Sequence, residues 1–431
     1  MITKQKGTYD VLPNEVFKWH IVEHKLRHVC DLYNFKEIRT PIFEASELFH
    51  RGIGSTSDIV TKETYDFTDR GGRMITLRPE GTAGVVRAYV ENKLYANQNV
   101  TKLFYMGPIF RYERPQKGRF RQFSQFGVEA LGSASPLIDA EVIAFSVTCL
   151  KALGLKGVKV KINSIGDDES RANYRNALVN HFSQYKECLC GDCLNRLENN
   201  PLRILDCKVD GDKDFFKGAP KIKDYLNEAS KNHFNKVLEA LESAKIDYEI
   251  KDNLVRGLDY YSNTVFELEA DIDGFGSSNV VGGGGRYDEL VSFLDGPKTP
   301  CVGMAFGLDR LIAICDNEGM FEGHKEHIHA YLITLGEKAK LKGQELLMKL
   351  RMGGILTDTD FLDKSLKAQF KQADNMNARF TLILGEDEID KNVINVKDNL
   401  NEVQETVLLD NLYQYLLEKL TCNKDCSKCG R

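Results

Sequence analysis

The 431-residue chain lacks any long apolar stretch, and this absence limits the classes to which it can belong. Its opening residues, MITKQKGTYDVLPNE, contain no apolar segment of the kind found in secretory signals. No later stretch reaches the roughly 18 consecutive apolar residues of a membrane span. We therefore expect a cytoplasmic protein with no membrane partner.

The chain also lacks an excess of positive charge. Its formal net charge is -5 at pH 7, so it has no overall attraction for nucleic acid. A polyanion would have to be held by a local patch. One such patch is the stretch 102–121, where six basic residues accompany Glu113 as the single acidic residue.

Common nucleotide-binding signatures are missing as well. The glycine-rich stretch VVGGGGRYDEL, residues 280–290, fits neither G-x-G-x-x-G nor G-x-x-x-x-G-K-[ST], so neither a Rossmann site nor a P-loop is predicted. The absence of H-R-D and D-F-G signatures argues against a kinase-related protein. The glycines would still let the backbone approach a ligand closely.

Eleven cysteines without a secretory signal favour reduced thiols over disulfides. They include two groups with some resemblance to metal sites: Cys188, Cys190, Cys193 and Cys207, and the tail residues Cys422, Cys426 and Cys429. Cys-x-Cys-x2-Cys with a distant fourth cysteine is an irregular spacing, and the tail offers only three ligands. Zinc binding at either group therefore stays open.

Length and patterning predict more than one domain. We expect one domain over residues 1–325, with a charged, helical insertion at about 167–250 that has no strand alternation. GHKEHIHA is predicted to be a linker. Alternating strand and helix patterns then predict an α/β unit over 326–420, followed by a cysteine-rich tail at 421–431: HAYLITL and RFTLILG as strands, and KAKLKGQELLMKLRMGG, KSLKAQFKQAD and DNLYQYLLEKL as helices.

Three histidines are spaced four residues apart in a predicted helix over residues 15–33. His20, His24 and His28 would share one face, as the ligands of a metal would. No carboxylate or open-site motif accompanies them, so a solvated face is the favoured interpretation.

The stretches LFYMGPIFRYER and FRQFSQFGVEALG, separated by PQKGR, predict a long β-hairpin with a basic loop. In the second strand, period-2 alternation gives one face to Arg121, Phe123, Gln125, Gly127 and Glu129. An aromatic ring, an amide and a carboxylate together are poorly suited to a core. The hairpin is therefore predicted to line a cleft rather than to expose a solvated surface.

Arginines mark three further polar stretches. Arg111 lies in the first hairpin strand and shares a face with Glu113. Arg310 follows the strand in CVGMAFGLDRL, and Arg256 lies near the start of LVRGLDYYSNTVFELE, where an apolar strand entry would be ordinary. In TLRPEGTAGVVRAYVEN, Thr82 is predicted to begin a helix, and Glu80 either binds a ligand or stabilises the helix N-terminus. Such a set suits a nucleoside triphosphate together with a cationic or amphoteric small molecule.

These stretches, with GGGGRYD and GMAFGLDRL, resemble the histidyl-tRNA synthetase family of class II aminoacyl-tRNA synthetases. The resemblance implies an α+β catalytic domain with an antiparallel six-stranded sheet flanked by helices, and a C-terminal α/β anticodon-binding domain. It further implies ATP and Mg²⁺, L-histidine and tRNA(His) as partners. FKEIRTPIFEASELFHRGIG is similar to motif 1, through which this family forms homodimers.

The family pattern assigns roles by motif position. Arg111 and Arg256 would be catalytic, with Arg256 between the histidine carboxylate and the α-phosphate. ATP would contact Arg111, Glu113, Arg119, Phe123 and Arg310. Histidine would contact Glu80, Thr82 and Gln125 through its amino group and Glu129 and Tyr261 through its imidazole, with Tyr287 lining the pocket. The acceptor end of tRNA would meet Gln116, Lys117 and Arg121.

Lys364, Lys367 and Lys371, at i, i+3 and i+7 of a predicted helix, would either contact tRNA phosphates or form a solvated face. Ser124 stands where the family often has histidine or asparagine, but alternation turns it away from the cleft.

An alternative is the histidine-binding regulatory subunit of ATP phosphoribosyltransferase, a synthetase paralogue. That paralogue usually lacks the anticodon-binding domain and has degraded motifs. Here a complete C-terminal unit follows, and Arg111, Arg256 and Arg310 are all present. We therefore favour a histidine–tRNA ligase that forms histidyl-adenylate and then charges tRNA.

Overall fold

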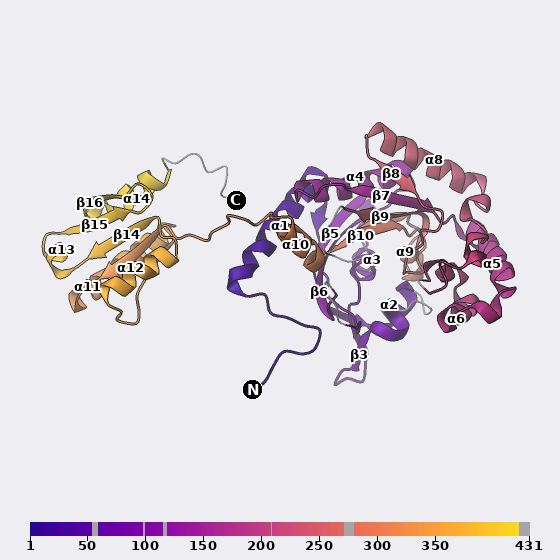
Figure 1. Ribbon diagram of the computed structural model, residues 1–431, viewed down its shortest axis with the longest axis horizontal. Coiled ribbons are helices and arrows are strands. Elements are labelled where there is room, and N and C mark those ends of the chain that lie inside the picture. Colours follow the sequence, from indigo (N-terminus) through magenta and orange to yellow (C-terminus); the bar gives the residue numbers. More distant parts are fainter. Residues whose placement is uncertain (54–58, 98–99, 115–118, 208, 271–279, 422–431) are drawn as a thin grey trace. The chain divides into compact units, whose positions relative to one another are not determined.

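The computed structural model describes residues 1–53, 59–97, 100–114, 119–207, 209–270 and 280–421. Two compact units make up the chain, Met1–Phe321 and Glu322–Arg431 (Figure 1). No helix among the described residues is both long and apolar enough to span a membrane.

An eight-stranded sheet forms the centre of the first unit, where the sequence predicts six strands. Its order is β1-β5-β6-β11-β10-β9-β7-β8. The six inner strands pair antiparallel, as predicted, and the short edge strands β1 and β8 add parallel pairs with β5 and β7. The strands are β1 Lys36–Glu37, β5 Thr101–Phe110, β6 Gln122–Leu131, β7 Lys159–Ser164, β8 Tyr248–Ile250, β9 Ser262–Glu269, β10 Val280–Arg286 and β11 Cys301–Gly307.

The predicted hairpin is confirmed as β5 and β6, which pair from Phe110 opposite Gln122 to Thr101 opposite Leu131. Alternation along β6 puts Phe126 and Val128 into the main hydrophobic core. The opposite face of β6 is therefore free to present polar side chains.

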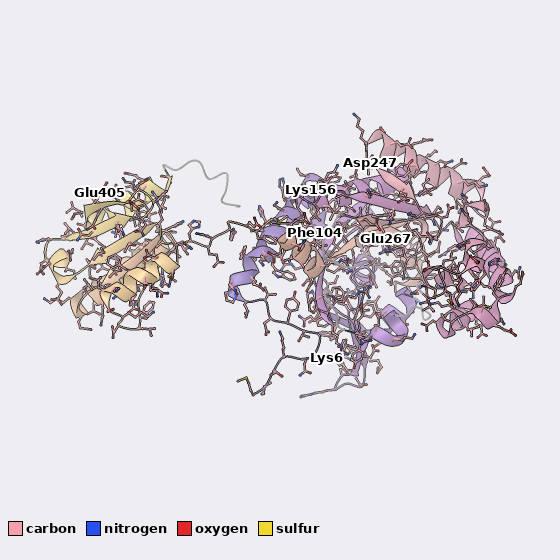
Figure 2. All side chains as sticks on the ribbon, viewed as in Figure 1. Lys6, Phe104, Lys156, Asp247, Glu267 and Glu405 are labelled. Carbon is pink, nitrogen blue, oxygen red and sulfur yellow. The ribbon has the colours of Figure 1, made fainter. Side chains whose placement is uncertain are left out.

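Helices cover the core face of this sheet. Side chains of α1 (Pro13–Leu32), α4 (Pro136–Ala152), α8 (Glu228–Ser243) and α10 (Leu308–Asn317) share one core with the strands. Figure 2 shows Phe104 within this unit and the exposed Asp247 at its periphery. On α1, the histidines 20, 24 and 28 are all exposed, which agrees with the solvated-face interpretation.

The other face of the sheet is only partly covered. The helices α3 (Thr82–Glu91) and α9 (Leu290–Phe293) pack there in a second core with tyrosines of the sheet. Beside them lies a three-stranded sheet in the order β2-β4-β3, with α2 (Ser46–Ile53), the π-helix η1 (Ile59–Glu63) and the 3-10 turn η2 (Leu94–Asn97) nearby in the sequence. Its strands are β2 Phe43–Ala45, β3 Tyr65–Thr68 and β4 Met74–Leu77.

The segment between β7 and β9 is mostly helical. It comprises α5 Asp168–Ser183, η3 Lys186–Cys188, α6 Gly191–Asn199, η4 Pro201–Asp206, α7 Asp214–Lys217, η5 Ile222–Asp224 and α8. Residues up to Leu226 share a small core of their own, whereas α8 packs on α4. The strand β8 also lies in this segment, where the sequence predicts no strand, because its three residues are too short for alternation to be recognised.

The second unit is built on a mixed five-stranded sheet in the order β13-β12-β14-β15-β16. The two predicted strands and three predicted helices are confirmed as β12 Ala330–Thr334, β14 Phe380–Leu384, α11 Glu337–Met352, α12 Leu366–Asn375 and α14 Leu412–Thr421. Further elements are β13 Thr357–Thr359, α13 Glu386–Asp390, β15 Val393–Asp398, β16 Val403–Leu408 and the turn η6 Leu409–Asn411. An antiparallel hairpin, β15–β16, therefore completes what the sequence predicts as a purely alternating unit.

Candidate active site

A polar pocket lies on the sheet face that α1 and α4 leave open. Most of the predicted ligand residues line it, and the rest of its polar wall comes from tyrosines: Glu80, Thr82, Tyr105, Arg111, Arg119, Gln125, Glu129, Arg256, Tyr260, Tyr261 and Tyr287. They come from β5, β6, α3 and the segments before β9 and after β10, so the fold assembles residues that are far apart in the sequence.

Glu129 forms the floor of this pocket. Its side chain is only 1% exposed, and its carboxylate accepts hydrogen bonds from Thr82 Oγ1 at 2.7 Å and from the Tyr287 hydroxyl. Burial raises the pKa of Glu129 to about 8, although these two donors oppose the shift. A carboxyl held in this way keeps its proton to about neutral pH and lies where it can exchange hydrogen bonds with a ligand in the pocket.

Glycines make room for the polar wall. Gly303 is paired with Glu129 across β11 and β6, and a Cβ at this position would lie 1.8 Å from Glu129 Oε2. Tyr105 is confined in the same manner, since a Cβ on Gly81 or Gly127 would come within 2.4 Å of its ring. Its hydroxyl donates to Gln125 Oε1 at 3.1 Å.

Tyr105 is a pocket residue that sequence reasoning missed. Tyr105 and Arg111 are an even number of positions apart, so period-2 alternation puts both side chains on the same face of an extended strand. That alternation was the signal that could have identified Tyr105. Tyr260 was missed as well. Its ring centroid lies 4.8 Å from that of Tyr261 and 5.6 Å from that of Tyr287, so the three rings form one wall.

Glu80 contacts a helix N-terminus and also lines the pocket. Its carboxylate accepts hydrogen bonds from the backbone N–H groups of Thr82 and Ala83, both at 2.7 Å, and so stabilises the N-terminus of α3. The same carboxylate lines the pocket. Burial raises the pKa of Glu80, and the backbone donors lower it in part.

Arg256 precedes β9 and lies against the sheet. Its Nη1 donates to Glu267 Oε1 at 2.5 Å, and its buried Nε makes no hydrogen bond within the described chain. A Cβ on Gly283 would come 3.0 Å from Nη1, so the glycine-rich strand allows the guanidinium this position. An orphaned buried donor beside a pocket is an expected feature of an anion site.

A second pocket adjoins the first and is rich in arginine. It is lined by Arg111, Glu113, Arg119, Phe120, Phe123, Gly307, Asp309 and Arg310. The two pockets are continuous, because Arg111 and Arg119 line both. The Arg111 guanidinium lies 5.5 Å from the centre of the Phe123 ring, and Arg119 Nη1 is 3.4 Å from Glu113. Burial, and then the nearby charge of Arg119, lower the pKa of Arg310.

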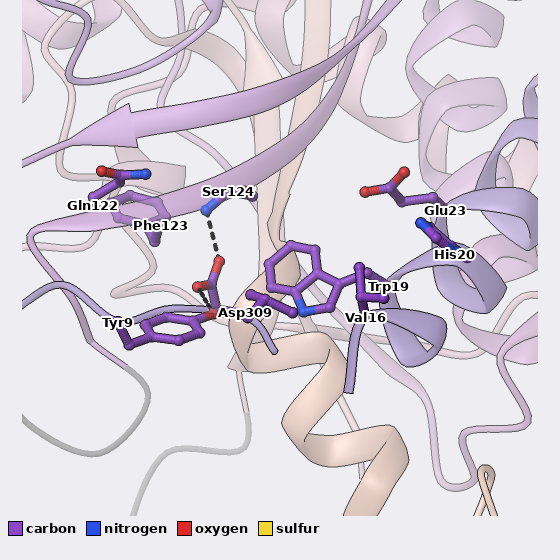
Figure 3. Close-up of a pocket in the computed structure, with 10 residues that line it drawn as sticks. Tyr9, Val16, Trp19, His20, Glu23, Gln122, Phe123, Ser124 and Asp309 are labelled. Atoms are coloured by element: carbon purple, nitrogen blue, oxygen red, sulfur yellow. Dashed lines mark hydrogen bonds between the residues drawn. The ribbon is translucent and has the colours of Figure 1, made fainter. Parts of the chain in front are cut away.

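The N-terminal segment contacts Asp309, one of the residues that line this second pocket (Figure 3). Tyr9 donates to Asp309 Oδ1 at 2.5 Å, and the Ser124 backbone N–H donates to Oδ2 at 2.6 Å. Asp309 thus joins the start of α10 to β6. Ser124 faces this supporting side, as predicted, and not the ligand pockets.

Not every predicted residue meets the pocket. Gln116 and Lys117 lie outside the described residues. Arg121 lines neither pocket: its guanidinium lies 3.8 Å from the centre of the Tyr112 ring, and its Nε donates to the Glu113 carbonyl at 3.2 Å. In the second unit, Lys364 precedes α12, so only Lys367 and Lys371 of the predicted lysine stripe are helical, and both are exposed.

The cysteine group of the helical segment differs from its predicted composition. Cys190, Cys193 and Cys207 meet, but their fourth neighbour is Asp210, whereas Cys188 is exposed. The three tail cysteines lie outside the described residues.

Comparison with known proteins places these features in a family. The family model for histidyl-tRNA synthetase matches residues 7–311, and an anticodon-binding-domain model matches residues 329–419. The chain belongs to the histidyl-tRNA synthetase family. The class II fold and the C-terminal anticodon-binding domain predicted from the motifs are thereby confirmed.

Individual members of the histidyl-tRNA synthetase family are similar over nearly the whole chain. Histidine–tRNA ligase of Bacillus subtilis is 53% identical over 406 residues, which cover 94% of this chain and 96% of that one. The Geobacillus enzyme of the same name is 52% identical and covers 96% of this chain and 99% of its own. The crystal structure of apo Staphylococcus aureus histidyl-tRNA synthetase superposes with a TM-score of 0.83, at 41% identity, and covers 96% of this chain and all of that one.

Proposed function

We propose that this chain activates histidine with ATP, releases pyrophosphate and transfers histidine from the adenylate to the 3' end of tRNA(His). The observation that carries the proposal is the continuity of the two pockets through Arg111 and Arg119. One pocket has a buried carboxyl and hydroxyls, and the other has arginines and an aromatic ring. An amino acid and a nucleotide could therefore meet at a shared, positively charged boundary.

The histidine subsite comprises Glu80, Thr82, Gln125, Glu129, Tyr261 and Tyr287. The amino group of histidine would contact the first three, and its imidazole would contact Glu129 and Tyr261. Glu129 supports this assignment because its buried carboxyl, which accepts hydrogen bonds from Thr82 and Tyr287, lines the same pocket. An amino acid without ring nitrogens would form no hydrogen bond with this desolvated carboxyl, which gives strong discrimination.

The ATP subsite comprises Arg111, Glu113, Arg119, Phe123 and Arg310. The Phe123 ring provides a stacking surface, and the arginines provide bidentate donors for phosphate oxygens. The nearby carboxylates Glu113 and Glu267 are each paired with an arginine. Mg²⁺ would therefore arrive on the phosphates as part of the ATP substrate and be held mainly by phosphate oxygens and water.

The chemistry needs alignment and charge neutralisation more than covalent help. The histidine carboxylate is itself the nucleophile and attacks the α-phosphorus of ATP, with pyrophosphate as the leaving group. Arg111 and Arg256 would neutralise charge that develops on the α-phosphate. The terminal ribose hydroxyl of tRNA then attacks the mixed anhydride, and AMP leaves.

The remaining partners follow from the same assignment. Gln116, Lys117 and Arg121 would approach the acceptor end of tRNA, and the exposed Lys367 and Lys371 would contact phosphates near the anticodon. A homodimer through the region of motif 1 and a cytoplasmic location are part of the proposal.

ATP–pyrophosphate exchange with each of the twenty amino acids tests the proposal. We expect exchange with histidine alone, and we expect Arg256→Ala to abolish most of it. Arg73→Ala, which removes a 79% exposed arginine outside both pockets, is the matched control and should retain full exchange. Tight histidine binding without exchange would instead favour the regulatory subunit of ATP phosphoribosyltransferase.

A further inference from the structure

A cluster of four ligand-type side chains lies in the helical segment, apart from both pockets. The Sγ atoms of Cys190, Cys193 and Cys207 and a carboxylate oxygen of Asp210 all lie within 4.8 Å of one another. Cys193, Cys207 and Asp210 are buried, and Cys190 is partly exposed. We propose that these four residues bind a structural zinc ion.

The sequence spacing supports a paired-ligand site once aspartate is counted. Cys190 and Cys193 form a Cys-x2-Cys pair, and Cys207 and Asp210 form a Cys-x2-Asp pair. Two such pairs, separated by a helix and a turn, have the arrangement of zinc sites built from two Cys-x2-Cys units. Counting Cys188 as a ligand obscures this regularity.

The geometry fits a tetrahedral ion. Cys190 Sγ and Cys207 Sγ are 3.7 Å apart. Two thiolates on one zinc, each with a Zn–S bond near 2.3 Å, are separated by about 3.8 Å. Because a disulfide requires about 2.05 Å between the sulfur atoms, these two are not bonded to each other.

Groups around the cluster are arranged to support anionic ligands. The Asp210 backbone N–H donates to Cys207 Sγ at 3.4 Å, and the Cys190 N–H donates to Asp210 Oδ2 at 2.9 Å. The other carboxylate oxygen, Oδ1, forms an ion pair with Lys213 Nζ, which lies 2.7 Å from it. Three thiolates and a carboxylate exceed the charge of one zinc ion, and Lys213 offsets part of that excess. Such outer contacts orient metal ligands in known sites.

The helical segment also has a physical need for such a site. Up to Leu226 it has a small separate core, to which Cys193 and Cys207 themselves belong. A core of this size contributes little net stability, and small units of this kind commonly use a metal or disulfides.

Zinc here would also fix a contact with the candidate active site. Between the two ligand pairs, Asn200 donates to Asp259 Oδ1 at 2.7 Å, and Arg203 donates to the Gly257 carbonyl at 3.3 Å. Both acceptors belong to the loop that carries Arg256 and Tyr261. The zinc site would therefore hold α6 and η4 against the loop that the proposed chemistry uses.

Metal content of the purified full-length chain is the decisive measurement. To remove the tail as a second source, Cys422, Cys426 and Cys429 are all changed to serine, and zinc is measured by mass spectrometry after purification under reducing conditions. We expect one zinc per chain, lost in Cys193→Ser and Asp210→Ala and retained in Cys188→Ser. Cobalt(II) added to metal-free protein should give thiolate-to-metal charge-transfer absorption and tetrahedral d–d bands.

Because serine variants can misfold, the variant Asp210→Cys provides an independent test. It should bind zinc more tightly than the parent chain, since it completes a four-cysteine site. The proposal would be overturned if the folded parent chain bound neither zinc nor cobalt, or if these cysteines formed a disulfide in protein purified under reducing conditions.

A kinetic test rests on the proposed function. Zinc removal should lower histidine-dependent exchange by roughly tenfold to a hundredfold, because the loop that carries Arg256 would be misplaced. A chain that contains one zinc ion but shows no exchange would contradict the proposed function and would leave the zinc proposal standing.

Discussion

Gly303 and Glu129 face each other across β11 and β6, and the missing side chain of one makes room for the carboxylate of the other. A Cβ at position 303 would lie 1.8 Å from Glu129 Oε2 and 2.8 Å from the backbone oxygen of Val128. Since the backbone cannot move without disturbing the ladder, the carboxylate would have to move instead.

Gly303→Ala is therefore expected to damage the proposed histidine subsite. It should raise KM for histidine in pyrophosphate exchange by at least about tenfold, a loss of about 1.4 kcal/mol in binding. KM for ATP should change much less, because the arginine-lined pocket lies beyond this contact.

Gly52→Ala is the control for this substitution. It adds the same methyl group within α2, where the nearest atoms would lie 3.4 and 3.6 Å away in ordinary contact. We expect normal kinetics from it. An unchanged histidine KM in Gly303→Ala would show that Glu129 can move without loss of function and would argue against its role in binding the ring.

The raised pKa of Glu129 predicts a pH dependence of stability. Its pKa in the folded chain is about 8, compared with an ordinary value of 4.5. Between these values the folded state holds a proton that the unfolded state has released, so the free energy of unfolding falls as pH rises, at up to about 1.4 kcal/mol per pH unit. Below about pH 4.5 the contribution is complete, and above about pH 8 it is lost.

Urea unfolding of the parent chain and of Glu129→Gln, without histidine, measures this contribution. Glutamine keeps the shape of the side chain but does not titrate, so the difference between the two curves should shrink or change sign across this window. Parallel pH profiles would mean that Glu129 titrates near its ordinary value. Saturating histidine should flatten the profile of the parent chain, because the ligand would then pair with the carboxylate.

The β-hairpin shows how much of the site can be read from the sequence. Period-2 alternation assigns Gln125 and Glu129 to one face of β6 and Phe126 to the other, and the structure confirms both. Alternation works there because a ten-residue strand buries one face and leaves the other to a pocket. Arg121, with the same parity, lies before the strand begins and packs on Tyr112 instead.

Other features depend on contacts that local patterns do not encode. The parallel edge strand β8 has three residues, too few for a period to emerge. Asp210 joins the cysteines because a tight turn brings it back to Cys207, and an aspartate carries no signature of its own. Likewise, the glycine-rich stretch predicts only that backbone can approach a ligand closely, and the structure forms from it a central strand whose Gly282 and Gly283 line the first pocket.

The contact between Tyr9 and Asp309 predicts a role for the N-terminal segment in ATP binding. Tyr9→Phe removes one hydroxyl and leaves Asp309 Oδ1 without that donor, at an expected cost of about 1–3 kcal/mol in stability. Asp309 adjoins Arg310 and accepts a hydrogen bond from Ser124, which adjoins Phe123. KM for ATP should therefore rise while KM for histidine stays nearly constant.

Tyr112→Phe is the matched control, because the Tyr112 side chain is 53% exposed. It should change neither constant. Equal effects on both substrates in Tyr9→Phe would indicate general destabilisation, which the unfolding midpoint of the same variant would reveal.

Arg286 of the glycine-rich strand forms a buried ion pair with Asp139 at the start of α4, and this pair predicts a large effect on stability. Both side chains are at most 1% exposed, and Arg286 also donates to the carbonyl oxygens of Ser133 and Ser135. Arg286→Met alone would leave the buried Asp139 without its guanidinium partner, although the His233 ring still lies 3.3 Å from Oδ1, at an expected cost of about 3–5 kcal/mol. The double variant with Asp139→Leu removes both charges and should recover much of that loss, because well-packed apolar groups replace buried ion pairs at little cost.

Urea unfolding of the parent chain, the two single variants and the double variant gives the coupling energy between the two residues. Additive losses would show that each residue acts through other partners and that the pair does not hold β10 to α4.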